Sequence, residues 1–207
     1  TNKANSSLKM KKDMISFLKK NYNGNNMLEF GTAGGNTTAV LAQICKEKGG
    51  KVYTVDLPLQ GPGFSWGNKG PISRSIRINR LNNASSLIRK LNLSEYVVFI
   101  QADLYKDNWQ KHIDHIEFSF IDAVHKVKAV EIDTQNAIKL GSKYICYHDY
   151  GLNLIKQDYN SNSAVKIYLS NNKNIYTDKN LIGEEKGKWV TGWGTNDYEG
   201  CIIKVSE

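Results

Sequence analysis

The fold of this chain is decided by Met27-Leu28-Glu29-Phe30-Gly31-Thr32-Ala33-Gly34-Gly35-Asn36-Thr37, where a short apolar strand ends at a glycine-rich turn. The glycines permit a tight turn and a close approach of the backbone to a ligand. Asn36 or Thr37 can cap a following helix, which we expect over about 37–47. Free amides at the N-terminus of such a helix bind carboxylates and phosphates. The stretch therefore predicts a strand, a turn and a helix with a ligand at the turn.

Strand-like and helix-like segments alternate on both sides of this unit. Apolar strands are expected at 27–30, 51–56, 97–100, 118–121 and 144–147, and helices at about 7–21, 37–47, 74–91, 104–113, 126–139 and 162–170. Such alternation is typical of a doubly wound parallel sheet with right-handed crossovers. Two antiparallel strands joined by a turn at 195–197 are expected within 188–205. We therefore expect one α/β domain over 1–207, with a Rossmann-like seven-stranded sheet of five parallel strands and a C-terminal antiparallel hairpin.

The composition of the 207 residues is that of a globular domain, with 40% hydrophobic and 23% charged residues. No apolar run approaches the ~20 residues of a membrane span, so we expect no membrane-spanning helix. The three cysteines lack CxxC spacing, which disfavours a disulfide framework and a cysteine zinc site and favours a reducing cytoplasm. The sequence leaves open whether the chain forms a homo-oligomer.

The net charge is +8, and basic residues concentrate in the segments 1–20 and 57–94. This balance favours an anionic partner, such as a phosphate, a nucleotide sugar, a nucleic acid or a membrane surface. Solvated, lysine-rich helix faces explain the same charge without any partner. The sequence does not decide between these two explanations.

The segment 57–73 holds all three prolines and four glycines, and it is longer than the usual connection from a strand to a helix. Long loops in compact domains are often lids, so we expect this loop, with the N-terminal helix in 1–22, to cover the site. Five side chains of this loop and of the helix expected after it could contact a bound substrate, the aromatic ones by covering it and the basic ones by meeting an anionic group: Phe64, Trp66, Lys69, Arg74 and Arg77.

Acidic side chains follow the first three strands. Glu29 stands two residues before Gly31, where a carboxylate can bind an ammonium group directly or through water. The glycines at 31, 34 and 35 do not match G-x-G-x-x-G, which disfavours a nicotinamide oxidoreductase. Asp56 can accept hydrogen bonds from both ribose hydroxyls of an adenosine. Asp103 either faces an adenine amino group or caps a helix.

Carboxylates and imidazoles follow the fourth and fifth strands. Asp122 and His125 come after one strand, and His148 and Asp149 come after the other. The carboxyl ends of neighbouring parallel strands meet at one edge of the sheet, so these four side chains should surround one crevice. Together they are suited to holding a divalent cation or to acid/base chemistry.

These motifs together resemble a class I S-adenosylmethionine-dependent methyltransferase. The resemblance covers about residues 27–151. Within that class, the motifs resemble most specifically the small-molecule O-methyltransferases that include macrocin O-methyltransferase and cephalosporin-biosynthesis methyltransferase-like enzymes. It rests on five segments of this chain: Glu29 to Thr37, Val55-Asp56, Ile121-Asp122-Ala123-Val124-His125, Asp133, and His148-Asp149-Tyr150.

The resemblance implies a role for each matching residue. Glu29, Gly31 and Gly35 would line the methionine half of S-adenosylmethionine, with Asp56 at the ribose and Asp103 near the adenine. The remaining expected cofactor contacts are Thr32, Asn36, Thr37, Leu57 and Asp122, the last beneath the sulfonium. Asp122, His148 and Asp149 occupy the cation positions of metal-dependent relatives, and His125 would be the general base, with Asp122 as its competitor.

Several alternatives stay open at this point. Magnesium prefers oxygen ligands, whereas a histidine ligand favours manganese, zinc or iron, so the need for a metal and its identity are undecided. The resemblance implies a hydroxyl on a small molecule or sugar as the acceptor, and the basic residues Lys69, Arg74 and Arg77 favour an anionic group on it. A nucleic-acid methyltransferase is favoured by the charge but opposed by the lack of an Asn/Asp-Pro-Pro-Tyr-type motif and of a Pro-Cys pair. A protein that binds S-adenosylmethionine without methylating an acceptor is the other alternative.

Overall fold

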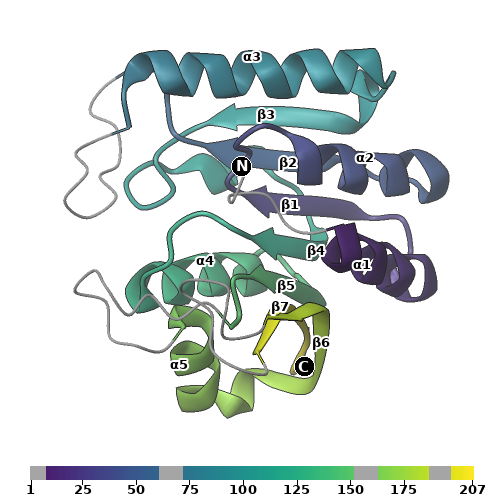
Figure 1. Ribbon diagram of the computed structural model, residues 1–207, viewed down its shortest axis with the longest axis vertical. Coiled ribbons are helices and arrows are strands. Elements are labelled where there is room, and N and C mark those ends of the chain that lie inside the picture. Colours follow the sequence, from purple (N-terminus) through teal and green to yellow (C-terminus); the bar gives the residue numbers. More distant parts are fainter. Residues whose placement is uncertain (1–7, 61–71, 152–162, 187–196) are drawn as a thin grey trace.

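The computed structural model describes residues 8–60, 72–151, 163–186 and 197–207, and these form one mixed sheet flanked by helices (Figure 1). The strand order is β3-β2-β1-β4-β5-β7-β6. The strands are β1 (Asn26–Phe30), β2 (Val52–Asp56), β3 (Val97–Gln101), β4 (Ile116–Ile121), β5 (Tyr144–His148), β6 (Tyr176–Lys186) and β7 (Asp197–Val205). The helices are α1 (Leu8–Asn21), α2 (Asn36–Lys48), α3 (Arg74–Lys90), α4 (Val127–Lys139) and α5 (Ala164–Asn171).

The pairing of the strands confirms the expected seven-stranded Rossmann-like sheet. Strands β1 to β5 are parallel where they pair, and β7 joins β5 and β6 in antiparallel fashion. The order reverses at β1, which lies between β2 and β4. Ligands of such sheets bind at the carboxyl ends of the strands near this reversal.

A separate apolar core covers each face of the sheet, because successive strand residues point to opposite sides. Met27 and Phe120 belong to one core, and Leu28 and Ile121, their neighbours in sequence, belong to the other. Residues of α1, α2 and α3 complete the first core, and residues of α4 and α5 complete the second. Both faces are buried, which accounts for the continuous apolar runs in the central strands.

Two sequence predictions differ from the structure. Residues 104–113 form turns and a short 3-10 helix (Trp109–His112) instead of an α-helix. The indole Nε1 of Trp109 donates to the carbonyl of Leu104 at 3.2 Å, and the buried ring packs edge-on against Phe30, so this connection folds inward as a compact turn.

The C-terminal hairpin begins earlier in the chain than the sequence predicts. Its first strand, β6, starts at Tyr176, whereas we expected the hairpin to begin at 188. The second strand agrees with the prediction, and the segment 188–194, expected as the first strand, lies outside the described residues. The polar residues Asp178, Lys179 and Asn180 hide the strand pattern, because this edge strand is exposed there.

Most of the predicted lid lies outside the described residues, including Phe64, Trp66 and Lys69. Arg77 is buried at the start of α3, and its guanidinium donates to the backbone carbonyls of Pro58 and Gln60. It therefore ties the beginning of the 57–73 loop to α3, which differs from the expected contact with an acceptor. In the described ranges, no helix has the length and apolarity needed to span a membrane.

Candidate active site

The glycine turn after β1 packs against two other elements so closely that side chains are excluded. Gly31 has a φ of 95°, and a Cβ there would lie 2.6 Å from the carbonyl oxygen of Asp122. Gly35 has a φ of 78°, and its Cβ would lie 2.7 Å from the Cβ of Ala84 in α3. The turn therefore brings the N-terminus of α2 next to the carboxyl end of β4.

The N-terminus of α2 differs in detail from the expectation. Gly35 occupies the capping position in a left-handed conformation, without a side-chain cap, and the helix begins at Asn36. The prediction that Asn36 or Thr37 caps the helix is therefore wrong. A glycine at this position leaves the first amides of the helix without the oxygen that a capping side chain supplies, as in helix termini that bind anions.

Glu29 lies beneath the turn as a buried carboxyl group. Its Oε2 accepts hydrogen bonds from Thr38 Oγ1 at 2.5 Å and from Thr54 Oγ1 at 2.6 Å. Thr54 Oγ1 also lies 2.6 Å from Thr32 Oγ1, which joins the turn to β2. Burial raises the pKa of Glu29 to about 8, although the two hydroxyls oppose the shift. Glu29 is thus placed at the predicted cofactor turn, and hydroxyl groups that sequence reasoning missed hold it.

Asp56 and Asp103 both bind backbone amides at the ends of their strands. Asp56 accepts from Ala33 N at 2.9 Å and from Leu57 N at 2.7 Å, so its carboxylate joins the β1 turn to the start of the 57–73 loop. Asp103 accepts from Tyr105 N at 3.0 Å and forms the turn that follows β3. The ribose and adenine roles of these carboxylates stay predictions.

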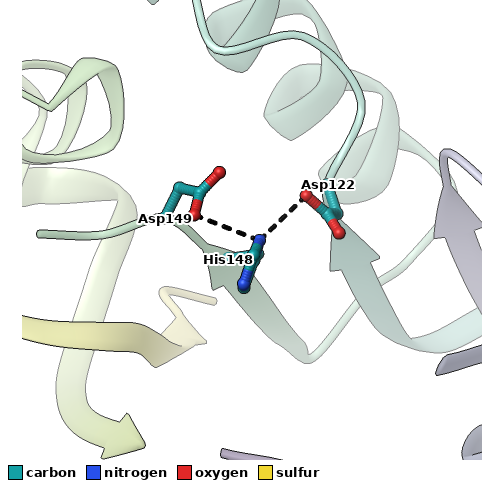
Figure 2. A group of neighbouring side chains, drawn as sticks. All are labelled: Asp122, His148 and Asp149. Atoms are coloured by element: carbon teal, nitrogen blue, oxygen red, sulfur yellow. Dashed lines mark hydrogen bonds and ion pairs between the residues drawn. The ribbon is translucent and has the colours of Figure 1, made fainter. Parts of the chain in front are cut away.

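The four ionisable residues at the carboxyl ends of β4 and β5 come together, and Figure 2 shows three of them, Asp122, His148 and Asp149. His148 Nδ1 lies 3.0 Å from Asp122 Oδ1 and 3.3 Å from Asp149 Oδ1, and the three side chains point toward one another. His125 Nδ1 lies 3.2 Å from the other oxygen of Asp149, Oδ2. Asp149 therefore joins two imidazoles, one on each of its carboxylate oxygens.

Asp149 is held in a backbone conformation that residues other than glycine seldom adopt. Its φ is 56°, in the left-handed region, where aspartate is tolerated better than bulkier residues. Ser163 Oγ donates to the carbonyl of Asp149 at 3.0 Å, and the next amide, Tyr150 N, donates to Glu199 O at 3.1 Å. Such locally costly conformations persist where surrounding contacts fix them, and they cluster at functional sites.

The charges in this cluster stabilise one another. Burial alone would lower the pKa of His148, but the carboxylates of Asp122 and Asp149 raise it well above its ordinary value. Burial would raise the pKa of Asp149, but His148 and His125 hold it below its ordinary value. The cluster therefore favours a positive charge between Asp122 and Asp149, which a protonated imidazole or a cation can supply.

The donor set suits a small divalent cation. One ligand atom from each of Asp122, His148 and Asp149 lies within 4.8 Å of the others. Neighbouring ligand atoms around an octahedral Mg²⁺ or Mn²⁺ are about 3 Å apart, close to the 3.0 and 3.3 Å that separate His148 Nδ1 from the two carboxylates. Two carboxylates and one imidazole are ligands that manganese accepts more readily than magnesium does.

Two buried carboxyl groups have no role in the sequence-based prediction of the site. Glu199 of β7 is buried, and its Oε1 lies 3.5 Å from His148 Nε2. Asp133 of α4 is fully buried and accepts a hydrogen bond from Tyr105 OH at 3.3 Å. Asp133 belongs to the family resemblance, but no role was assigned to it. Glu199 lies in the hairpin, and only the pairing of His148 with Gly200 brings it beside the site.

Comparisons with known proteins agree with this geometry. A family model described as a methyltransferase domain matches residues 28–150. The cofactor-bound structure of Rv0187 from MTB has a TM-score of 0.66 and 20% identity and covers 100% of this chain and 84% of that chain. The O-methyltransferase TomG from Streptomyces achromogenes, involved in tomaymycin synthesis and solved in complex with SAM, has a TM-score of 0.59 and 15% identity over 94% of this chain and 79% of its own.

A third solved structure, a Staphylococcus aureus protein assigned as a caffeoyl-CoA O-methyltransferase, has a TM-score of 0.61 and 15% identity. It covers 95% of this chain and 82% of that chain. The comparison with curated proteins gives no match. At these identities the three structures establish a shared fold, and the family model establishes the kind of domain.

Proposed function

Since this chain belongs to the methyltransferase domain family, as an S-adenosylmethionine-dependent enzyme, we propose that it methylates a hydroxyl group of a small molecule or sugar with the help of a divalent cation. The observation that carries this proposal is the cluster of Asp122, His148, Asp149 and His125. It lies at the carboxyl ends of β4 and β5, directly beside the glycine turn that receives the cofactor in our proposal.

The cofactor site in this proposal is the crevice between the β1 turn and the ends of β2, β3 and β4. When bound, S-adenosylmethionine supplies a methyl group on a sulfonium that is already activated. The turn around Gly31 and Gly35 allows close approach, and Glu29 lies below it as the candidate partner of the ammonium group. The other proposed contacts are Thr32, Asn36, Thr37, Asp56, Leu57, Asp103 and Asp122.

Asp122, His148 and Asp149 would hold the cation in this proposal. A cation bound there would bind an acceptor hydroxyl and lower its pKa. The protein residues then have to align the acceptor with the methyl group and exclude water from the crevice. A cation site formed from the ends of two adjacent strands is rigid, and rigid support keeps reacting groups in line.

His125 is placed to act as the general base. With its Nδ1 hydrogen donated to Asp149 Oδ2, the neutral ring carries its lone pair on Nε2. Asp149 would thus orient the base through one oxygen and hold the cation through the other. Asp122 is the competing base, but its Oδ1 is already 3.0 Å from His148 Nδ1. We therefore favour His125 as the base that accepts the proton of the acceptor hydroxyl and Asp122 as a ligand of the cation.

The acceptor is proposed from the narrower resemblance to small-molecule O-methyltransferases, the group that includes macrocin O-methyltransferase. The basic surface supports an anionic group on that acceptor. Arg74 is exposed at the start of α3, close in sequence to the 57–73 loop, and can meet such a group. Arg77 is excluded from this role because it is buried and bonded to the loop backbone.

The proposal is tested with metal-stripped protein and labelled S-adenosylmethionine. We expect S-adenosylhomocysteine to bind without added metal, and methyl transfer to a hydroxyl-bearing pool of sugars or phenols to require Mn²⁺ or Mg²⁺. NAD serves as the control ligand and should not raise the melting temperature. Transfer to RNA in place of the small molecules would favour the nucleic-acid alternative. Binding of the cofactor with no transfer to any pool would favour a non-methylating binder.

A further inference from the structure

We propose that Glu199 is a positioning residue, which fixes the ring of His148 so that Nδ1 faces the cation site. This inference rests on the proposed function, because it assigns a supporting residue to the cation site of Asp122, His148 and Asp149. Glu199 is outside that ligand set, and its Oε1 lies 3.5 Å from Nε2, the ring nitrogen of His148 on the side away from the two aspartates.

The first argument is burial. The side chain of Glu199 is 4% exposed and that of His148 is 8% exposed. Transferring a carboxylate from water to such a place is costly unless a positive or hydrogen-donating partner faces it. The ring nitrogen Nε2 of His148 can be that partner. A glutamate at this position is therefore difficult to explain by packing alone.

The second argument is that the fold makes room for this side chain. Gly183 of β6 has a φ of 89°, and a Cβ there would lie 2.7 Å from the Cβ of Glu199 and 3.0 Å from its Oε2. A larger residue at 183 would displace the carboxylate. The hairpin thus has a glycine, in a left-handed backbone conformation, at the point where the side chain of Glu199 passes over β6.

The third argument is that the backbone of Glu199 is part of the same site. Its carbonyl accepts the amide hydrogen of Tyr150 at 3.1 Å, immediately after Asp149. His148 pairs with Gly200, the next residue of β7. Residue 199 therefore contacts the site twice, through its side chain at His148 and through its backbone beside Asp149.

The chemistry follows from the two nitrogens of imidazole. When Nε2 donates its hydrogen to a carboxylate, the neutral ring carries its lone pair on Nδ1. Nδ1 is the atom that lies 3.0 Å from Asp122 and 3.3 Å from Asp149, so this tautomer directs the lone pair at the cation. A carboxylate behind a metal-binding histidine orients the ring and raises its basicity in many proteins.

The test compares Glu199→Gln with wild-type protein by titration with Mn²⁺, following free Mn²⁺ by electron paramagnetic resonance. We expect Glu199→Gln to bind Mn²⁺ about 10–100-fold more weakly, the usual cost of removing such a supporting group. The control is Glu117→Gln. Glu117 is equally buried in β4, but it binds the backbone and side-chain amides of Asn23 and Asn25 at the opposite end of the strand. Its Mn²⁺ affinity should stay within about twofold of wild type.

A second readout follows the ring itself. Nitrogen-15 spectra of the histidines in Mg²⁺-saturated protein should show a protected Nε2–H for His148 in wild type and its loss of protection in Glu199→Gln. Binding of S-adenosylhomocysteine by both variants shows that each is folded. Unchanged Mn²⁺ affinity and an unchanged Nε2–H signal in Glu199→Gln would overturn the positioning role and leave the cation site intact. A wild-type protein that binds no Mn²⁺ would overturn the cation site and this role with it.

Discussion

Asp122 Oδ1 and His148 Nδ1 are 3.0 Å apart, and they join the carboxyl ends of the adjacent strands β4 and β5. Neither residue lies on a loop that can move independently: Asp122 N donates to the carbonyl of Phe30 in β1, and His148 is the last residue of β5. The contact is therefore a fixed property of the sheet. It places a buried imidazole against a carboxylate where a cation can replace a proton between them.

The first prediction concerns Asp122→Asn, which removes one negative charge and one cation ligand. We expect Mn²⁺ affinity to fall at least about tenfold, as titration of free Mn²⁺ would show. The control is Asp114→Asn, which should leave the Mn²⁺ affinity unchanged. Asp114 is exposed and lies just before β4, at the opposite end of that strand from Asp122. Equal Mn²⁺ affinity in Asp122→Asn and wild type would remove Asp122 from the ligand set.

The second prediction concerns His125→Ala. Loss of a general base lowers turnover by about 10²–10⁴-fold. The Mn²⁺ and S-adenosylhomocysteine affinities should stay within about twofold, because His125 belongs to neither proposed ligand set and its Nδ1 contacts Asp149 through Oδ2, the oxygen that is not assigned to the cation. The control is His115→Ala, which should keep full turnover. His115 is exposed and directly precedes β4, at the amino-terminal end of that strand and so away from the site. Steady-state kinetics and calorimetry on the same preparations make the comparison. Full turnover in His125→Ala would assign the proton to Asp122 or to solvent.

The sequence predicts the central site well because the carboxyl ends of parallel strands meet at one edge whatever the details of the loops. Predicting that the side chains of the site meet requires only that β4 and β5 be neighbours. These side chains are Asp122, His125, His148 and Asp149. Glu199 could not be found this way, because its place depends on the antiparallel register between β5 and β7. Charged residues in the exposed edge strand β6 hide that register in the sequence.

The connection after β3 shows a second limit. Residues 104–113 have apolar side chains at helical spacing, and periodicity alone predicts a helix there. The structure instead has a turn at Asp103, whose side chain accepts from Tyr105 N, and an inward-packed Trp109. Local hydrogen bonds from an aspartate compete with helix formation. Here that competition and the burial of an indole outweigh the helical pattern.

The third prediction compares two neighbouring glycines of the β1 turn. Gly35→Ala would place a Cβ 2.7 Å from Ala84 at a φ of 78°, and we expect it to lower the free energy of unfolding by about 1–3 kcal/mol. In Gly34→Ala the nearest atom, on the Asn36 side chain, is 3.8 Å away, so the change should stay within about 0.5 kcal/mol. Urea unfolding measures both. Equal stability of the two variants would contradict the packing of α2 against α3.

The fourth prediction concerns the pH dependence of stability through Asp133. Burial raises its pKa from 3.8 to about 7, even though Tyr105 donates a hydrogen bond to it, and Oδ1 lacks a hydrogen-bond partner among the described residues. The folded state therefore binds this proton more tightly than the unfolded state does. Its contribution to stability is complete below about pH 4 and is lost as the pH rises to about 7.

Asp133→Asn should remove this part of the pH dependence, because the amide does not ionise. Each pKa unit of difference corresponds to about 1.36 kcal/mol, so the variant should gain stability relative to wild type between pH 4 and pH 7 and keep that gain at pH 8. Urea unfolding at pH 4, 5, 6, 7 and 8 gives the two curves, and Asp114→Asn, at an exposed position, is the control with no such gain. Parallel curves for Asp133→Asn and wild type would mean that Asp133 ionises equally in both states. In that case a polar group or water reaches Oδ1 in the folded protein and offsets its burial.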